Sequence, residues 1–449
     1  MQNRTIKNYS FIAILLSCFS IASARPNIIF ILADDMGYAD IGCYGAKDVA
    51  TPNLDKLAAK GIKFTNVYAM GAECTPSRTS LLTGRYPQRV KGMECAIGTG
   101  NVGRYDDAIE LADQNELGLP ASRAVLAPAL NNAGYHNGVF GKWHLGYEDH
   151  FSPLDQGFDE FTGFLGGNVD YFHHVELSPI HVLLTGREKV KREGYTTDLI
   201  SSDATTFIGK MAADKDTPFF LYLPHAAPHF PFQAPDSDTT LPTKENWLAG
   251  DRETYAKMIE SLDDSVGNLV KALEETGQRK NTLIVFASDH GAIRPGDNGP
   301  YRDFKSTLFE GGIRVPLIAN WPGHLEGGKT FEDVGTLMDL TTSFLRIGNA
   351  TVPDGKNLDG IDLLQHAADG TTPKERTIPW RAKRGDRTWR AFRKGEWKYV
   401  SKTDGNATEE WLFNLASDPY EKNNLAPENP KMLSELKSEL ADWEAQVAL

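Results

Sequence analysis

The chain is poor in cysteine and, after its first 24 residues, has no long apolar run. Four cysteines in 449 residues do not make the dense disulfide framework of small secreted domains. None of the later apolar stretches resembles a membrane-spanning helix, which needs roughly 20 apolar residues. We find no internal repeat and no low-complexity segment, so a repeat architecture is excluded.

Positive charge is also scarce, with 47 Lys and Arg against 60 Asp and Glu and a formal net charge of −13. Phosphate contacts need a basic surface, so we expect no nucleic-acid partner. An acidic enzyme that acts on an anion must gather positive charge locally. The apolar fraction of 41% is ordinary for a globular protein, and the length favours one large domain with a smaller one.

Residues 1–24 have the pattern of a secretory signal peptide. Arg4 and Lys7 precede the short apolar run 11–16, and a small-x-small cleavage site ends at Ala24. We therefore expect an exported protein, periplasmic or secreted. Residues 15–18 loosely resemble a bacterial lipoprotein box, but its second Leu fits poorly, so lipid anchoring is the less favoured alternative.

Alternating strand and helix patterns predict a large α/β domain over residues 25–352. Continuous apolar runs, which are typical of buried strands, occur at 27–32, 218–223, 282–287 and 315–319, and two further strands are predicted at 62–69 and 136–144. Helical patterns are found at 52–60, 122–133, 197–211, 253–275 and 336–347. The polar, Gly-containing segment 91–118 is interpreted as a loop or rim insertion.

A different pattern begins after residue 353 and predicts a small C-terminal domain over 353–449. Short aromatic–basic runs at 389–393 and 397–400 indicate an antiparallel sheet. A final helix opens at Asn429-Pro430 and carries Leu433, Leu436, Leu440 and Trp443 on one face.

The stretch Glu73-Cys74-Thr75-Pro76-Ser77-Arg78 places a lone thiol beside a cation and the start of a predicted helix. A thiolate in such a place is a candidate nucleophile; the alternative is a free cysteine on a loop.

Carboxylates follow two of the predicted strands. Asp34 and Asp35 come after the first strand and Asp289 after the strand 282–287, at the ends where open α/β sheets place ligands. Three converging carboxylates repel one another unless a cation neutralises them, and such oxygens suit Ca²⁺ or Mg²⁺. Taken singly, each aspartate also fits a helix cap or a turn.

Cys-x-Pro-Ser-Arg at 74–78, followed by Leu-Thr-Gly-Arg at 82–85, resembles the signature of type I sulfatases, in which the cysteine is oxidised to formylglycine before folding. Five further motifs agree in the family's order: LADDMG at 32–37, GKWH at 141–144, APHFP at 227–231, SDHG at 288–291 and KSTLFEGGIRVP at 305–316. The resemblance implies an alkaline-phosphatase-like α/β/α sandwich with a smaller C-terminal domain of an antiparallel sheet plus a helix.

The resemblance also implies a metal site for one Ca²⁺ per chain. Its ligands would be Asp34, Asp35, Asp289 and His290, together with the modified Cys74. Many family members have Asn where His290 stands, although a His variant occurs. An imidazole is softer than an amide oxygen, and a histidine that merely follows a metal aspartate is the alternative.

The implied mechanism uses the hydrated aldehyde of formylglycine. One hydroxyl attacks sulfur and expels the alcohol, and the second hydroxyl then releases the covalent sulfate ester. His144 is the candidate base and His229 the candidate acid. Lys142 and Lys305 would hold sulfate oxygens, and Arg78 would orient the diol. If the strand 136–144 holds, Lys142 and His144 share a face.

We expect sulfate ester hydrolysis, on a sulfated polysaccharide or oligosaccharide, in a chain that a formylglycine-generating enzyme matures. The alternatives are a phosphonate or phosphate ester hydrolase of the same superfamily and an inactive exported glycan-binding protein.

Several features stay open from sequence. The stretch from Lys374 to Lys402 has eleven Lys or Arg against three acidic residues and fits either a polyanion contact or a solvated face. If it contacts a polyanion, reversing the charges of Arg384 and Arg387 should impair a polymeric substrate more than a small aryl sulfate. The remaining candidates are His173, His174 and 91–118 for the cleft rim, His225 as subsite or packing residue, and Cys43 with Cys95 as a disulfide.

Overall fold

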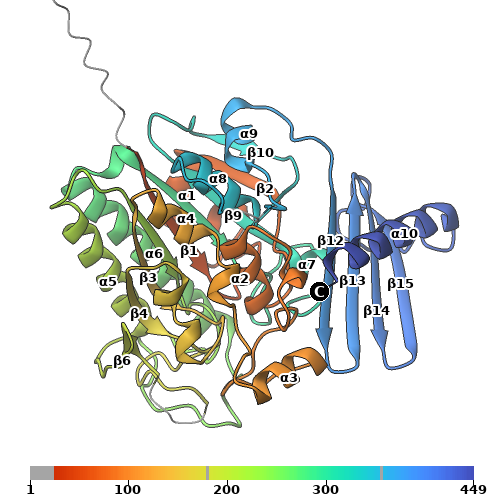
Figure 1. Ribbon diagram of the computed structural model, residues 1–449, viewed down its shortest axis with the longest axis horizontal. Coiled ribbons are helices and arrows are strands. Elements are labelled where there is room, and N and C mark those ends of the chain that lie inside the picture. Colours follow the sequence, from red (N-terminus) through yellow and green to blue (C-terminus); the bar gives the residue numbers. More distant parts are fainter. Residues whose placement is uncertain (1–24, 178–181, 354–356, 449) are drawn as a thin grey trace, which may run out of the picture.

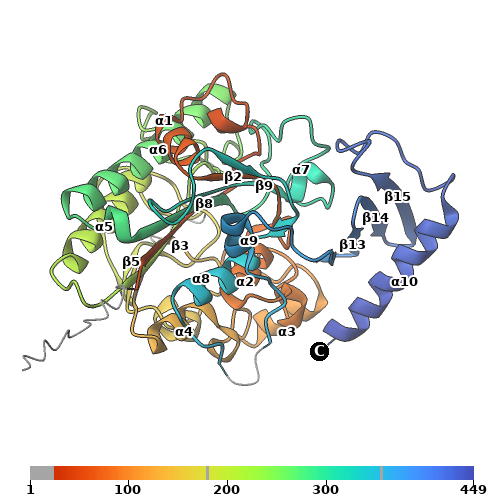
Figure 2. The ribbon, with the colours of Figure 1, turned by 90° about the horizontal axis from the view of Figure 1, so that it is seen from above.

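The apolar runs form one large mixed sheet with helices on both faces (Figure 2). The structure is a computed structural model that describes residues 25–177, 182–353 and 357–448, so the predicted signal peptide lies outside the described residues. None of the described helices is both long enough and apolar enough to cross a membrane. A second, smaller sheet lies beside the large domain (Figure 1).

Parallel strands form the middle of the large sheet, in the order β8-β1-β7-β3-β4. Their bounds are β8 Thr282–Ser288, β1 Asn27–Ala33, β7 Phe219–Pro224, β3 His136–Lys142 and β4 Glu160–Phe164. Every residue of β1, β7 and β8 is buried, which explains their unbroken apolar sequences.

The outer strands make the sheet mixed. β9 pairs antiparallel with both β8 and β2, and β10 and β11 run parallel to β2. These strands are β9 Arg314–Asn320, β2 Ile62–Tyr68, β10 Lys329–Phe331 and β11 Gly335–Thr336; at the other edge lie β5 Leu184–Thr185 and β6 Glu188–Lys189.

Alternate residues of β1 serve two separate cores. Ile28 and Phe30 belong to one apolar cluster, whereas Ile29 and Ile31 belong to another, because successive strand side chains point to opposite faces. The first face is covered by α2 Cys74–Thr83, α4 Leu126–Asn132, α8 Asp339–Ile347 and α9 Leu363–Asp369. The second is covered by α1 Pro52–Ala59, α5 Thr196–Met211 and α6 Arg252–Glu275.

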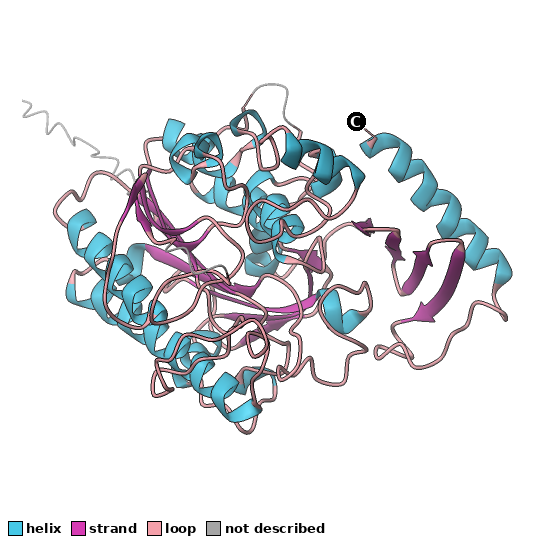
Figure 3. Ribbon diagram, turned by 90° about the horizontal axis from the view of Figure 1, so that it is seen from below, coloured by secondary structure: helices cyan, strands magenta, loops and turns pink. Residues whose placement is uncertain are grey.

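The C-terminal residues form a four-stranded antiparallel sheet and a helix, as predicted. The strands are β12 Thr377–Arg384, β13 Arg387–Lys394, β14 Trp397–Asp404 and β15 Ala407–Asn414. The helix α10, Pro430–Val447, packs Leu436 and Leu440 on one face of the sheet (Figure 3). The opposite face packs Trp380 and Phe413 against Phe309 of the large domain.

Some expected boundaries differ in the structure. The segment 91–118 contains the helix α3, Asp106–Asp113, and the predicted helix 122–133 is the short turn Ala121–Arg123 followed by α4. The division at residues 352 and 353 stays a prediction; α9, which lies beyond it, packs Leu363 and Leu364 into the core of the large domain. A last short helix, α7 Glu310–Ile313, lies at the junction of the two sheets.

Candidate active site

Three parallel strands of the central sheet, β8, β1 and β3, bring the predicted residues to one edge of the sheet. Asp34 and Asp35 follow β1, Asp289 and His290 follow β8, and Lys142 is the last residue of β3. Because parallel strands end on the same side, residues 108 to 254 positions apart in sequence meet there. All five are buried.

Cys74 faces this edge from the first position of α2. Its thiol donates to Asp34 Oδ1 at 3.4 Å, and its Sγ lies 3.2 Å from Lys142 Nζ and 3.8 Å from Lys305 Nζ. His290 Nε2 is 3.4 Å from the same sulfur. The sequence-predicted nucleophile position is therefore surrounded by the sequence-predicted cations.

The two lysines favour the thiolate form of Cys74. Burial and the carboxylate of Asp34 both oppose a thiolate, but the ammonium groups of Lys142 and Lys305 outweigh them and lower the pKa of the thiol. These cations are the local positive charge that an acidic enzyme needs for an anionic substrate.

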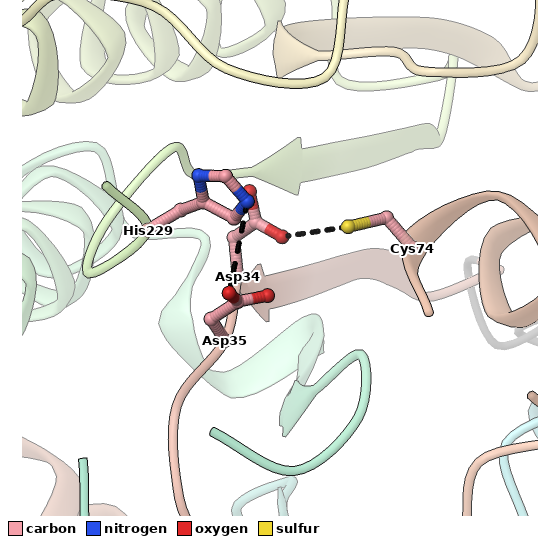
Figure 4. Close-up of side chains that lie close together, drawn as sticks. All are labelled: Asp34, Asp35, Cys74 and His229. Carbon is pink, nitrogen blue, oxygen red and sulfur yellow. Dashed lines mark hydrogen bonds and ion pairs between the residues drawn. The ribbon is translucent and has the colours of Figure 1, made fainter. Parts of the chain in front are cut away.

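Figure 4 shows Asp34, Asp35, Cys74 and His229 pointing toward one another. Two sets of four potential ligand atoms each lie within 4.8 Å. They are Asp34, Asp35, Cys74 and His229, and Asp34, Cys74, Asp289 and His290. A hydrogen bond of 2.9 Å between His290 Nδ1 and the Gly291 carbonyl turns Nε2 toward the carboxylates, as in histidines that bind metals. The donor set of three carboxylates and one imidazole fits a divalent cation.

The electrostatics of the carboxylates agree with a cation site. Burial opposes ionisation of Asp34, but Lys142, with His229, Arg78 and Lys305, holds its pKa well below the ordinary value. For Asp35 burial prevails over Lys305, and the pKa rises to about 7. A carboxylate that burial disfavours is one that a bound divalent cation would stabilise.

Arg78 lies beneath the cluster and has no exposed surface. Its Nε and Nη2 donate to Asp289 Oδ2 at 3.2 and 3.1 Å, and its Nη1 donates to the Lys142 carbonyl at 2.9 Å. Ser77, to which the sequence assigned no role, donates to the Asp289 carbonyl at 2.5 Å. These bonds attach helix α2 to the ends of β8 and β3.

The strand argument that placed Lys142 and His144 on one face is wrong. β3 ends at Lys142, and His144 has a φ of 60°, so strand alternation does not extend to it. Its Nε2 lies 2.8 Å from the carbonyl of Ile97. Its Nδ1 is buried and has no hydrogen-bond partner in the described part of the chain. Burial and the charge of Lys142 lower the pKa of this imidazole well below its ordinary value.

His229 and Lys305 complete the cluster. His229 Nε2 lies 3.6 Å from Asp35 Oδ2 and 3.3 Å from Lys305 Nζ, while its Nδ1 is 2.7 Å from the Phe230 carbonyl. Lys305 Nζ donates to both oxygens of Asp35 at 2.6 and 2.8 Å. Burial lowers the pKa of His229 well below its ordinary value. The catalytic roles predicted for these residues stay predictions.

The other histidines and cysteines lie elsewhere. His225 packs in the interior with Nε2 3.3 Å from Ser265 Oγ. His174 is buried near the Gly194 carbonyl, whereas the side chain of His173 is 47% exposed beside Asp170. Cys43 and Cys95 are free thiols and do not form the disulfide considered from sequence.

The basic stretch 374–402 is largely neutralised by ion pairs. Most of the acidic partners belong to the large domain or to α10, as in Arg381–Glu94 and Lys394–Glu435. Nine of its eleven cations form such pairs in the described structure: Arg376, Arg381, Lys383, Arg384, Arg387, Arg390, Lys394, Lys398 and Lys402. The stretch mainly attaches the small sheet to its neighbours.

Comparison with known families decides what this site belongs to. The Sulfatase family model matches residues 26–350. The chain belongs to the sulfatase family. It is a sulfuric ester hydrolase, and its large sheet followed by a four-stranded sheet and a final helix is the sulfatase fold.

Relatives of this sulfatase include enzymes with named substrates. N-acetylgalactosamine-6-sulfatase of Rattus norvegicus is 35% identical over 369 residues, which cover 78% of this chain and 67% of the relative. N-acetylgalactosamine-6-O-sulfatase of Bacteroides thetaiotaomicron is 29% identical and covers 94% and 93%. The crystal structure of Ps i-CgsB is 35% identical, with a TM-score of 0.82 and coverage of 94% and 93%. Another structure shows Ps i-CgsB in complex with k-i-k-neocarrahexaose.

Proposed function

We propose that this sulfatase removes a sulfate ester from a carbohydrate, outside the cytoplasm, with Cys74 as the precursor of a formylglycine. The observation that carries the proposal is the buried Cys74 Sγ, 3.2 Å from Lys142 Nζ and 3.8 Å from Lys305 Nζ, beside the aspartate cluster. Support for a carbohydrate comes from relatives named for acetylgalactosamine sulfate and from the oligosaccharide complex of Ps i-CgsB.

In the mature enzyme, the hydrated aldehyde at residue 74 would supply the hydroxyl that attacks sulfur. Lys142 and Lys305 place two ammonium groups around this position and would stabilise negative charge on the sulfuryl oxygens. His229 borders the cluster beside Lys305 and stays the candidate acid for the departing alcohol, a role that requires a proton on the Nε2 atom that faces Lys305. His144 offers its unpartnered Nδ1 as the proton acceptor.

Asp34, Asp35, Asp289 and His290 would hold the cation, which we propose to be one Ca²⁺. Oxygen ligands favour this ion, although the imidazole of His290 is a softer donor. When bound, the ion would add positive charge beside the nucleophile and lower the cost of ionising a hydroxyl there. A formylglycine-generating enzyme would have to act on the chain before residue 74 is buried.

The proposal is tested with a panel of defined sulfated oligosaccharides and with matched nitrophenyl sulfate and phosphate. We expect NMR to show loss of sulfate from one position of at least one oligosaccharide, and turnover of the aryl sulfate well above that of the phosphate. Cys74→Ala should abolish turnover and keep the fold. Mass spectrometry of the Cys74 peptide should show the aldehyde in protein from its native host.

The alternatives give different results. Faster phosphate hydrolysis would favour the phosphonate or phosphate ester hydrolase, and glycan binding without turnover by fully oxidised protein would favour the inactive binding protein. An unmodified, active thiol would refute the formylglycine mechanism. Export is tested separately by finding the mature N-terminus at residue 25 outside the cytoplasm.

A further inference from the structure

Glu73, directly before Cys74, has a buried carboxylate that four donors surround. Oε1 accepts from Ser306 Oγ at 2.7 Å and from Arg384 Nη1 at 2.8 Å. Oε2 accepts from the Ala96 N–H at 2.8 Å and from the Cys95 thiol at 3.1 Å. The residue is 6% exposed. A carboxylate that satisfies four donors from three separate segments restrains all of them.

The first of these segments supports the candidate base. After Cys95 and Ala96, the Ile97 N–H donates to Thr75 Oγ1 at 3.1 Å, and the Ile97 carbonyl lies 2.8 Å from His144 Nε2. Thr75 Oγ1 itself donates to the His144 carbonyl at 3.1 Å. The side chains on either side of Cys74 therefore clamp the segment 95–97, and that segment holds the imidazole so that Nδ1 stays unpartnered.

The second segment carries a sulfate-binding candidate. Ser306 follows Lys305, has a φ of 68°, and donates its N–H to the Ala72 carbonyl at 2.8 Å. Its hydroxyl bond to Glu73 fixes the turn from which Lys305 reaches Asp35. The third segment is the end of β12, where Arg384 belongs to the small sheet. The Glu73 carboxylate thus connects the candidate base His144 and the candidate sulfate-binding Lys305 with the small sheet.

We infer that Glu73 is a positioning residue that holds His144 and Lys305 at the nucleophile and couples the small sheet to the reaction. This role deepens the proposed function and rests on it. Misplacing catalytic groups by about 1 Å lowers turnover by about 100-fold. Loss of the carboxylate should therefore reduce kcat rather than substrate affinity.

Glu94 provides the matched control. Glu94 directly precedes the segment 95–97 and is also 6% exposed. It joins the same two domains, because its carboxylate accepts from Arg381 Nε at 2.7 Å and from Arg381 Nη2 at 2.8 Å. Its carboxylate, however, contacts β12 cations and not the residues beside Cys74 or Lys305. A purely structural role at the domain junction would affect Glu73→Met and Glu94→Met alike.

The experiment measures kcat and KM for an aryl sulfate in Glu73→Met, Glu73→Gln and Glu94→Met. Because Glu73 lies in the modification motif, kcat is expressed per folded chain whose residue 74 is an aldehyde by mass spectrometry. We expect kcat to fall about 100-fold in Glu73→Met and about 10-fold in Glu73→Gln, which keeps one acceptor, with KM within about twofold of wild type. Glu94→Met should stay within about twofold in kcat.

Equal kcat values for the Glu73 and Glu94 variants would overturn the inference. If Glu73→Met does not fold, Glu73→Gln gives the same comparison. Arg384→Met should lower kcat when it is introduced into the wild type and should have no further effect when it is introduced into Glu73→Met. Additive effects of the two substitutions on kcat would refute the coupling to the small sheet. An inactive, fully oxidised wild type would instead refute the proposed function, so the two failures are distinguishable.

Discussion

A buried lysine between two carboxylates should hold the small sheet to the large domain. Lys398 of β14 lies 2.8 Å from Glu310 Oε1 of α7 and 2.9 Å from Glu421 Oε1, and all three side chains are fully buried. Glu310 also accepts from Tyr68 and Arg314 at 2.7 and 3.2 Å. Lys398→Met would remove the ammonium and, above about pH 7 where Glu421 ionises, leave Glu421 as the poorly compensated charge.

Removing one partner of a buried ion pair costs about 3–5 kcal/mol. Burial already raises the pKa of Glu421 to about 7, against an ordinary glutamate value of about 4.3. This carboxyl is therefore protonated below pH 7 with or without Lys398. Without the lysine its pKa rises further, and a raised folded-state pKa means that stability is lost as pH rises through it. The deficit of the variant should grow between pH 6 and pH 8.5.

The assay is urea unfolding followed by intrinsic fluorescence, with comparison of midpoints at equal slope. Lys402→Met is the control, because Lys402 lies on the same strand but is 26% exposed and forms only long ion pairs, at 3.8 and 4.0 Å from its acidic partners. Its expected cost is below about 1 kcal/mol. Lys398→Met together with Glu421→Gln should recover much of the loss. If the free energies of unfolding of Lys398→Met and Lys402→Met differ by less than about 1 kcal/mol, the reasoning is refuted.

Four further outcomes follow from the site and its surroundings. Chelation of divalent ions should abolish aryl sulfate turnover, and Ca²⁺ should restore it better than Mg²⁺. If metal analysis shows that no ion is bound and turnover is undiminished, the cation site is contradicted. Burial lowers the pKa of His225 to about 3, so at this residue the unfolded chain takes up a proton below about pH 6.5 and the folded chain does not. When the pH falls from 7.5 to 5, the free energy of unfolding measured in urea should therefore decrease by about 2 kcal/mol less in His225→Gln than in the wild type. In Gly167→Ala a Cβ would lie 2.6 Å from His144 Cε1, so kcat should fall by about 10- to 100-fold with little change in KM, and an unaltered kcat would argue against His144 as a base. Arg384 is bonded to Glu73, so reversing its charge should impair every substrate, and Arg387→Glu becomes the better test of a glycan contact; equal turnover losses on a polymer and on an aryl sulfate would exclude that contact.

Much of the large domain could be predicted because its central strands are buried on both faces. The runs at 27–32, 218–223 and 282–287 match β1, β7 and β8 to within one or two residues. Helix α3 was missed, because it lies within the polar, Gly-containing segment 91–118 that was interpreted as a loop, and Ala108 is its sole buried residue. The antiparallel direction of β9 was not predicted, because apolar runs carry no information on strand direction.

Part of the candidate site could likewise be predicted from the sequence, and part could not. Asp34, Asp289 and Lys142 follow from strand ends and motifs, and the structure brings them together with Cys74. The reason given for His144 was wrong, because its position depends on a turn with positive φ and on the Ile97 carbonyl. Backbone carbonyls have no sequence signal. An acidic residue directly before Cys74 was the one clue to Glu73, and its partners could not be inferred from it.

By itself the sequence determined the family, the side-chain types of the candidate site and the order of the elements, because these depend on residue type and local periodicity. The tertiary structure alone decided which cations are neutralised. The basic stretch 374–402 reads as a polyanion contact or a solvated face, yet most of its charges pair with carboxylates distant in sequence. It also decided that Glu73 meets Ala96, Ser306 and Arg384, because a buried carboxylate needs donors, and folding determines which segments supply them.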